Sequence, residues 1–318
     1  MLRPRRRPPH PFRHDTPSNF PTDPLYRLGT RVTLSFVLRP RRRDESLDDD
    51  APATPTAPYP QAMFSSHRPA PHVWPEARPL HLGDGDVGVV LAHGFTGSVA
   101  AIRPWAEALA TPDDGWAGAR VVAPRLPGHG TSWQDMARTR WWDWYAAVED
   151  AYLHLAAERR QVFVGGLSMG GALALRLAAR HKVAGVMLVN PAIASRDLRI
   201  AVASRVRWLV PPQKGIASDI AKPHVVEPAY PKFSVRSLGS MTDLWREARA
   251  GLRGVEAPVL LMRSPQDHVV DDLSAELIRR DVRDVRVAPL ERSYHVATLD
   301  HDADLIVAES RRFIASLS

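Results

Sequence analysis

Ser168 lies at the centre of the segment GGLSMGG, residues 165–171, with Gly166 two positions before it and Gly170 two positions after it. A serine between glycines at this spacing can be a nucleophile on a tight turn between a strand and a helix. Glycine and serine are common residues, so the pattern arises by chance in roughly one chain in ten of this length. The segment lacks the Gly-Lys-Ser/Thr ending of a phosphate-binding loop. The function of Ser168 therefore depends on the partners that the rest of the chain supplies.

A serine nucleophile needs a base, because an unassisted hydroxyl is barely nucleophilic at neutral pH. The chain has 13 histidines, and His295 in RSYHVATLD is the one that follows the last expected core strand and precedes the final expected helix. His301 borders that helix, which favours a capping or surface position. We therefore predict that His295 is the base.

The base in turn needs a carboxylate that fixes its tautomer and stabilises the imidazolium. Asp267 comes first in the loop SPQDHVVDD, after an apolar strand candidate. Asp271 and Asp272 fit better as the cap and first turn of the next helix, where the helix dipole favours carboxylates. Asp197 follows the preceding strand and is an alternative. The predicted set is Ser168, Asp267 and His295.

A serine nucleophile also needs hydrogen-bond donors for any oxyanion that forms on its substrate. The segment LAHGFTG, residues 91–97, ends a strand, and we assign one donor to the backbone N–H of Phe95 and the other to that of Met169. We expect His93 to be structural, with a second base as its alternative. His129 in RLPGHGTS has no second ligand at suitable spacing, so neither a metal nor a cofactor is expected.

The elements that must position these residues alternate along the chain after residue 78. Continuous apolar runs predict buried parallel strands, and amphipathic stretches between them predict helices on both faces of the sheet. The fold class is therefore α/β. The expected strands are 78–82, 87–93, 119–124, 161–166, 184–190, 257–264 and 284–290, and the expected helices are near 99–110, 141–157, 169–180, 271–280 and 302–316.

Residues 192–254 interrupt the alternation, since they hold helix-like pieces and no convincing strand. A structureless loop of this length is improbable in a compact domain, so we predict a helical cap inserted between two parts of the core, 76–191 and 255–318. Its apolar residues suggest an acyl chain as ligand. The predicted pocket residues are Phe95, Ile200, Val202, Trp208 and Leu209.

The first 75 residues are rich in proline and arginine, and we expect them to be a disordered arm. Residues 1–62 contain eleven Arg, no Lys and seven Asp or Glu, so they contribute +4 of the formal net charge of +7. The remainder has an ordinary balance, and no nucleic-acid partner is expected. The arm itself could touch nucleic acid or anionic lipid; alternatively it is a solvated tail or an upstream extension, with Met63 as the start.

Cysteine is absent from the 318 residues, which excludes disulfides, thiolate metal sites and cysteine nucleophiles. No segment approaches the roughly 20 apolar residues that span a bilayer. The apolar run VTLSFVL, residues 32–38, is short for the core of a signal peptide and has no cleavage site after it. We therefore expect a cytoplasmic protein.

From residue 78 to 318 the chain resembles the α/β-hydrolase superfamily, and within it the bacterial carboxylesterase and monoacylglycerol lipase group. The resemblance rests on LAHGFTG, RLPGHGTS before a Trp-Asp helix start, GLSMGG, SPQDHVV and SYHVATLD. It implies an α/β-hydrolase fold, a triad of Ser168, Asp267 and His295, and an oxyanion hole from the amides of Phe95 and Met169. The insertion would be the lid over the acyl pocket. The arm has no counterpart, and the insertion carries no motif that can be mapped.

The resemblance implies a serine hydrolase that cleaves carboxylic esters of apolar acyl chains through an acyl-enzyme intermediate. The expected partner is a small-molecule acyl ester, transient contact with lipid aggregates is possible, and the oligomeric state is left undetermined. Thioesterases, acyltransferases, perhydrolases and carbon–carbon hydrolases use the same triad and remain alternatives. A non-catalytic ligand receptor on the same scaffold is the alternative from another class.

Overall fold

The computed structural model describes residues 71–205, 210–215 and 218–318. The chain divides into two units, residues 1–65 and 66–318, and all the described residues belong to the second. The expected disorder of the arm and the alternative start at Met63 lie outside the described residues. Trp74 belongs to the folded part, because its N–H donates to the carbonyl of Gly130 and its ring packs edge-on against Tyr230.

A seven-stranded sheet forms the centre of the described part, in the order β1-β3-β2-β4-β5-β8-β9. β1 is antiparallel to β3, and all the other neighbours are parallel. The strand predictions are confirmed. The bounds are β1 Leu80–Leu82, β2 Val87–Ala92, β3 Arg120–Ala123, β4 Gln161–Leu167, β5 Gly185–Val189, β8 Val259–Arg263 and β9 Val285–Pro289.

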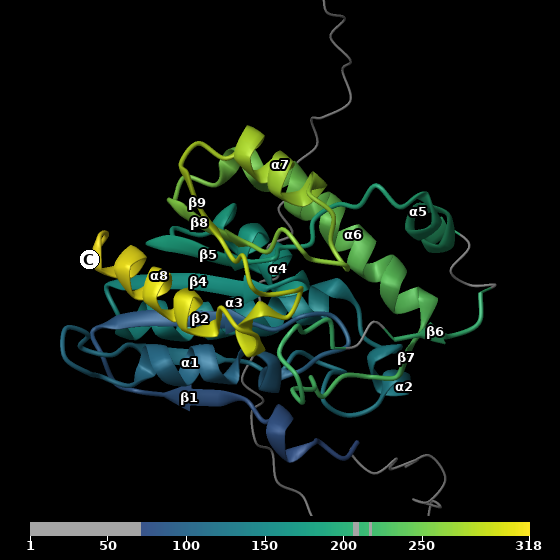
Figure 1. Ribbon diagram of the computed structural model, residues 1–318, viewed down its shortest axis with the longest axis horizontal. Helices are drawn as coiled ribbons and strands as arrows, with labels where there is room; N and C mark the ends of the chain where they lie inside the picture. Colours follow the sequence, from purple (N-terminus) through teal and green to yellow (C-terminus); the bar gives the residue numbers. More distant parts are fainter. Residues whose placement is uncertain (1–70, 206–209, 216–217) are drawn as a thin grey trace, which may run out of the picture. The chain divides into compact units, whose positions relative to one another are not determined.

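Helices cover both faces of this sheet, as the continuous apolar strands require. α1 and α8 pack together on one face, while α3 and α4 pack on the other (Figure 1). The helices of the core are α1 Arg103–Ala110, α2 Trp133–Met136, α3 Trp141–Glu158, α4 Met169–Ala178, α7 Leu273–Asp281 and α8 Ala303–Ala315, with short 3₁₀ turns at Pro75–Ala77, Val99–Ile102 and Ala297–Leu299.

α3 shows how the sequence forms these elements. The backbone N–H of Arg140 donates to the carboxylate of Asp143 at 2.8 Å, which caps the start of the helix. The buried residues of α3 recur at helical spacing and face the sheet and α4, as their pattern predicts. They are Trp144, Tyr145, Val148, Tyr152 and Leu155.

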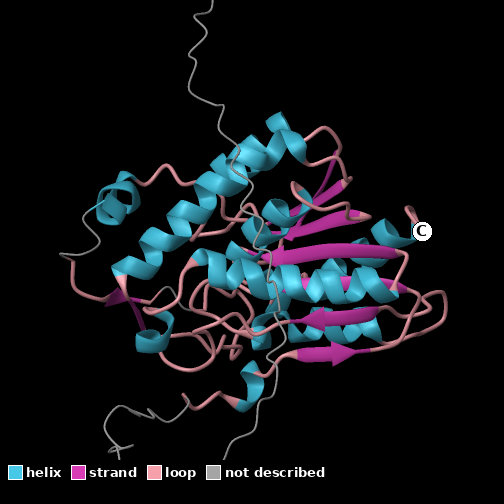
Figure 2. Cartoon of the chain, turned by 180° about the vertical axis from the view of Figure 1, so that it is seen from behind, coloured by secondary structure: helices cyan, strands magenta, loops and turns pink. Residues whose placement is uncertain are grey.

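The insertion between β5 and β8 contains α5 Leu198–Arg205, β6 Gln213–Lys214, β7 Lys232–Phe233, α6 Val235–Gly251 and a 3₁₀ turn at Leu252–Gly254. β6 and β7 form a two-stranded antiparallel pair, which the sequence did not reveal, because strands of two residues are too short to show a period. α6 packs on α3, α4 and α5. In Figure 2 the parallel strands point toward the side where these insertion helices lie.

Candidate active site

Ser168 joins β4 to α4 in a backbone conformation that residues other than glycine rarely adopt, with φ 55° and ψ −115°. Such a turn persists only where the surroundings impose it. Gly166 and Gly170 make it possible: a Cβ at Gly166 would overlap the backbone of Gly170, and a Cβ at Gly170 would overlap the carbonyl of Ala92. The predicted turn from strand to helix is therefore present, and it places Ser168 at the carboxyl end of the sheet.

His295 and Asp267 meet from two different loops. Nδ1 of His295 lies 2.8 Å from Oδ2 of Asp267, whose side chain is fully buried. The other oxygen, Oδ1, accepts the N–H groups of Val269 and Val270, each at 2.8 Å. With Nδ1 donating to the carboxylate, Nε2 is the ring nitrogen that can take a proton from a substrate or from serine.

Burial alone would raise the pKa of the Asp267 carboxyl, because it disfavours the charged form. The hydrogen bond and charge of His295, together with the amides of Val270 and Val269, outweigh burial and hold this pKa below its ordinary value. Asp267 is therefore a carboxylate at neutral pH and can stabilise an imidazolium.

Ser168 and His295 line the same cavity, which has a volume of about 150 Å³. Its walls are mostly apolar and come from the core loops and from the insertion. The apolar lining comprises Phe95, Leu167, Ala192, Ala194, Ile200, Phe233, Leu238, Met241, Trp245, Val269, Val270 and Val296. The structure thus brings the predicted nucleophile and base to a space that suits an apolar group.

One predicted oxyanion donor, Phe95, lines this cavity, and the other, Met169, directly follows Ser168 in the chain. Met169 is the first residue of α4, so its N–H has no partner within the helix and points out of the helix N-terminus. Phe95 lines the cavity, and the next residue, Thr96, has a φ of 63° that bends the loop. The assignment of both N–H groups to the oxyanion stays a prediction.

His93, two residues before Phe95, is fully buried. Its Nδ1 lies 3.0 Å from the carbonyl of Gly94, and its Nε2 accepts the N–H of Leu126 at 3.3 Å. Burial lowers the pKa of His93 to about 4, and it lowers the pKa of His129, whose ring lies edge-on to that of His93, well below the usual value. A neutral histidine with both nitrogens engaged holds the loop in place, which fits the structural role over that of a second base.

A model of the alpha/beta hydrolase family matches residues 89–309. The chain belongs to this family. Its sheet order, its covering helices and the turn at Ser168 are those of an α/β hydrolase, so the predicted fold class and resemblance are confirmed.

Three individual proteins that are similar to this chain are named as lipases or esterases. The hydrolase is 39% identical over 244 residues to the thermostable monoacylglycerol lipase of Bacillus sp. strain H-257, covering 75% of this chain and 94% of that protein. It is 26% identical over 246 residues to a carboxylesterase of Bacillus subtilis strain 168, covering 76% and 97%. A solved structure of LipS or LipT, two metagenome-derived lipolytic enzymes, has 36% identity and a TM-score of 0.73, covering 77% of this chain and all of that one.

The predicted pocket residues of the insertion divide into three groups. Ile200 lines the cavity with Phe95. Val202, two residues after Ile200, is 58% exposed and does not line the cavity. Residues two apart on a helix point to different sides, so Val202 faces away from the cavity that Ile200 lines. Val202 therefore does not belong to the pocket. Trp208 and Leu209 lie outside the described residues.

The alternative carboxylates lie elsewhere. Asp197 pairs with Arg199 at 2.8 Å within the insertion. Asp272 stands at the N-cap position of α7 without a capping side-chain hydrogen bond, and Asp271, just before it, accepts the N–H of Leu273 at 3.0 Å, so both lie at the helix start. Neither arrangement brings a carboxylate to His295.

Glu227 is a cavity residue that the sequence did not reveal. It is 9% exposed and lines the cavity with His295. Gly97, two residues after Phe95, makes room for Glu227, since a Cβ at Gly97 would overlap the carboxyl oxygen of Glu227. Burial raises the pKa of Glu227 to about 7, although the nearby charge of His295 opposes that shift. It lies in an aperiodic part of the insertion, which offers no sequence signal.

Asn190 was also missed, although its position at the end of a core strand is a usable signal. Its φ is 43°, and its side chain is completely buried. Nδ2 donates to the carbonyls of Tyr294 and His295 at 3.2 and 2.8 Å, while Oδ1 accepts the N–H of Ser264 at 2.8 Å. Asn190 therefore ties the loop of the base to the end of β8.

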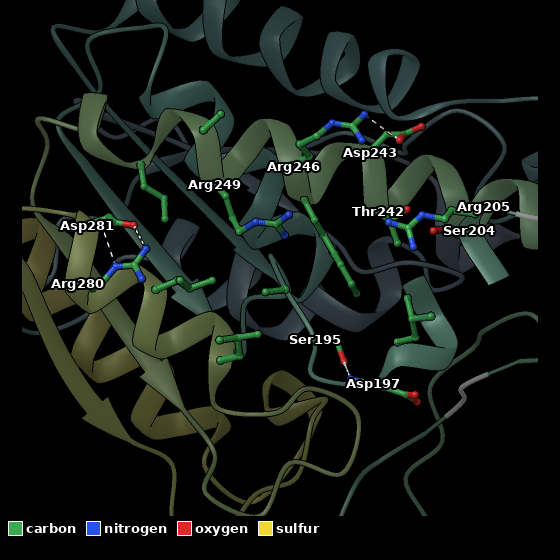
Figure 3. Close-up of a pocket in the computed structure, with 17 residues that line it drawn as sticks. Ser195, Asp197, Ser204, Arg205, Thr242, Asp243, Arg246, Arg249, Arg280 and Asp281 are labelled. Carbon is green, nitrogen blue, oxygen red and sulfur yellow. Dashed lines mark hydrogen bonds and ion pairs between the residues drawn. The ribbon is translucent and has the colours of Figure 1, made fainter. Parts of the chain in front are cut away.

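A second hollow, of about 1000 Å³, lies among α5, α6 and α7 (Figure 3). Arginines line it, but Arg246 pairs with Asp243 at 3.0 Å and Arg280 with Asp281 at 2.6 Å. Ser168 does not contribute to this hollow. The two spaces share the wall residues Ala194, Ser195, Ile200 and Trp245.

Within the described residues, no group of three or more His, Cys, Asp or Glu side chains is arranged to hold a metal ion. No helix there is long and apolar enough to cross a membrane.

Proposed function

We propose that the protein is a serine hydrolase that cleaves carboxylic esters through an acyl-enzyme intermediate. The observation that carries the proposal is the 2.8 Å contact between Nδ1 of His295 and Oδ2 of Asp267 beside a cavity that Ser168 also lines. The relatives named as a monoacylglycerol lipase, a carboxylesterase and lipolytic enzymes support the same reaction class.

The reaction follows from these positions. Ser168 attacks the ester carbonyl while Nε2 of His295 takes its proton, and Asp267 stabilises the imidazolium. The N–H groups of Phe95 and Met169 hold the oxyanion. The carbon–oxygen bond to the alcohol breaks, and the alcohol leaves with the proton from His295. Water, deprotonated by the same histidine, then attacks the acyl-enzyme and releases the carboxylic acid.

The lining of the cavity suits an ester with an apolar acyl group and a small polar alcohol. Most of its lining is apolar, whereas Glu227 and Asp219 add carboxyl groups at the edge near His295. A carboxylate can accept hydrogen bonds from the hydroxyl groups of an alcohol. A monoacylglycerol combines the two chemistries, and one relative carries that substrate in its name.

A fluorophosphonate probe tests the nucleophile directly, because it labels an activated serine covalently. The native protein should be labelled, Ser168→Ala should not, and Ser195→Ala, which removes another serine of the cavity wall, should still be labelled. Turnover of p-nitrophenyl esters should fall by about 10⁶-fold in Ser168→Ala. Undiminished hydrolysis by that variant would refute the assignment.

The substrate class needs its own experiment. Rates on p-nitrophenyl esters, monoacylglycerols and acyl thioesters of graded chain length should show esters hydrolysed faster than thioesters. Turnover of thioesters alone would make the protein a thioesterase, which is the alternative among hydrolases with the same triad.

Contact with lipid aggregates is a second proposal, and exposed apolar residues on α5 favour it. Leu198 is 78% exposed and Val202 58% exposed, one helical turn apart, and the side chain of the adjacent Arg199 is 92% exposed. Exposed apolar residues on one side of a helix suit contact with a lipid surface, while the charge of Arg199 is paired with Asp197. Leu198→Ser with Val202→Ser should weaken sedimentation with anionic vesicles, whereas Val287→Ser, on β9, should not. Equal sedimentation of all three proteins would contradict it.

The cytoplasmic location is likewise a prediction, and fractionation of cells that express the full chain tests it. An ester hydrolase recovered with the envelope or the medium would contradict it.

A further inference from the structure

Arg263 binds the same carboxylate oxygen as the predicted base. Its Nη1 donates to Oδ2 of Asp267 at 2.9 Å, and Nδ1 of His295 lies 2.8 Å from that atom. The side chain of Arg263 is 11% exposed and that of Asp267 is fully buried. The ion pair is therefore shielded from the solvent that weakens surface pairs.

The guanidinium of Arg263 is fixed by several further acceptors. Nη1 donates to the carbonyl of Ser264 at 2.7 Å, and Nη2 to the carbonyl of Val270 at 2.7 Å and to Asp272 at 3.3 Å. The side chain of Asp272 is 71% exposed, so solvent screens its charge and it neutralises Arg263 only in part. A planar, permanently charged group held through both of its terminal nitrogens is well suited to orient a carboxylate.

The charged groups around His295 come from three directions. Asp267 and, behind it, Arg263 come from β8 and the loop after it. The insertion contributes Glu227 on the cavity wall and Asp219, whose carboxylate accepts the backbone N–H of His295 at 3.1 Å. Two further titratable groups lie close by: Nδ1 of His268 is 2.8 Å from Asp219, and Asp300 accepts the N–H of Tyr294 at 2.9 Å. Arg263 is the group in this set that shares the carboxylate of Asp267 with His295.

We propose that Arg263 is a positioning residue that extends the activity of the hydrolase to lower pH, by opposing protonation of His295 in the resting enzyme. The proposal rests on the proposed triad. It adds a regulator of that site, which neither the motifs nor the relatives assign.

The physical reason is the competition of two cations for one oxygen. Protonation of His295 would place an imidazolium and a guanidinium against Oδ2 of Asp267, and like charges at such separations disfavour the second charge. The neutral imidazole, which is the form that accepts the proton of Ser168, is favoured instead. Without Arg263 the carboxylate would serve His295 alone, and the histidine would keep its proton to higher pH.

A purely structural role predicts a different result. Arg263 also anchors the loop 264–270 through backbone carbonyls. If that anchoring is its only contribution, its removal should lower kcat at every pH by the same factor and leave the shape of the pH profile unchanged.

The test is the pH dependence of kcat/KM for a p-nitrophenyl ester in Arg263→Met and Arg263→Lys. For Arg263→Met we expect the midpoint of the acid limb to rise by about 1 pH unit, with a much smaller change at the alkaline plateau. Arg263→Lys keeps the charge, so its midpoint should stay near that of the native enzyme even if the plateau falls. Arg280→Met is the matched control, since that arginine pairs with Asp281 away from the site.

Glu227 also lines the cavity, so the Arg263→Met shift should be measured again in a Glu227→Gln background and should persist there. An acid limb that does not move, or moves by the same amount in Arg263→Met and Arg263→Lys, would overturn the proposal.

A second readout needs no substrate. The pH at which the Nδ1–H resonance of His295 titrates, followed by proton NMR and assigned by its loss in His295→Asn, should rise in Arg263→Met and not in Arg263→Lys. This experiment separates the two proposals. A shift of the resonance in Arg263→Met would support the proposed role of Arg263, whatever the activity of Ser168→Ala. Continued activity of Ser168→Ala would refute the triad, whatever the shift. An unshifted resonance would overturn the role of Arg263 alone.

Discussion

The carboxylate of Asp219 accepts the backbone N–H of His295 at 3.1 Å, so the insertion is hydrogen-bonded directly to the residue proposed as the base. The same oxygen accepts the N–H of His268, next to Asp267, at 3.1 Å. Nearby, Asp300 accepts the amides of Ala221 and Tyr294 at 2.7 and 2.9 Å. This part of the insertion is therefore joined to the loop of Asp267 and to the loop of His295.

Replacing Asp219 with Ala should lower kcat about tenfold, because the loops that carry the acid and the base lose a common acceptor. The amides left without a partner should reduce the free energy of unfolding by about 1–3 kcal/mol. Kinetics and urea denaturation measure the two effects. Asp197→Ala is the control, since Asp197 pairs with Arg199 away from the triad. Unchanged kcat in Asp219→Ala would show that the insertion does not position the base.

Glu227→Gln should stabilise the protein at alkaline pH. The pKa of the buried Glu227 is about 7 in the folded protein, above its ordinary value of 4.5. The folded state therefore binds a proton more tightly than the unfolded state, and the stability contributed by that proton is lost as the pH rises from 4.5 through 7. The loss amounts to about 3 kcal/mol above pH 7.

Gln cannot ionise, so the melting temperature of Glu227→Gln should exceed that of the native protein at pH 8, and the difference should disappear near pH 4. A difference of the same size at both values of pH would mean that the carboxyl group is not the cause. The exposed Glu107→Gln is the matched control and should change neither.

His93 should make the protein sensitive to acid. Its pKa in the folded protein is about 4, below the ordinary value of 6.5, so the unfolded state binds a proton first as the pH falls. Stability is therefore present above pH 6.5 and is lost between pH 6.5 and 4, by about 3 kcal/mol for this residue.

Chemical denaturation at several values of pH measures this loss. The slope of unfolding free energy against pH should be shallower in His93→Gln than in the native protein. His154→Gln, at an exposed position of α3, should keep the native slope. Parallel slopes in all three proteins would contradict a buried neutral His93.

Gly170→Ala should damage the turn at Ser168. The added Cβ would overlap the carbonyl of Ala92 on β2, so backbone must move. We expect a loss of about 2 kcal/mol or more in the free energy of unfolding, together with most of the activity. Gly254→Ala serves as the control, because the nearest atom to its Cβ would be the carbonyl oxygen of Ala179 at 3.8 Å. Equal stability of the two variants would contradict the tight packing of the turn.

The core elements could be predicted from the sequence because their signals are local. β4 and β5 are buried along their length and read as continuous apolar runs, while α3 repeats its apolar residues at helical spacing. The glycines on either side of Ser168 predicted a tight turn between a strand and a helix, and Ser168 has the positive φ of 55° that such a turn requires. The two-residue strands β6 and β7 gave no such signal, and the exposed side of α5 at Val202 was not distinguished from its inner side.

The fold class, the order of Ser168, Asp267 and His295, and the loops on which they stand could be read from residue types over a few neighbouring positions. Folding was needed to show that Glu227 and Asp219 of the insertion line the cavity of Ser168 and His295, and that Arg263 and His295 contact the same oxygen of Asp267. Those contacts join residues far apart in the chain, and their energies arise from burial and charge that exist only once the chain is folded.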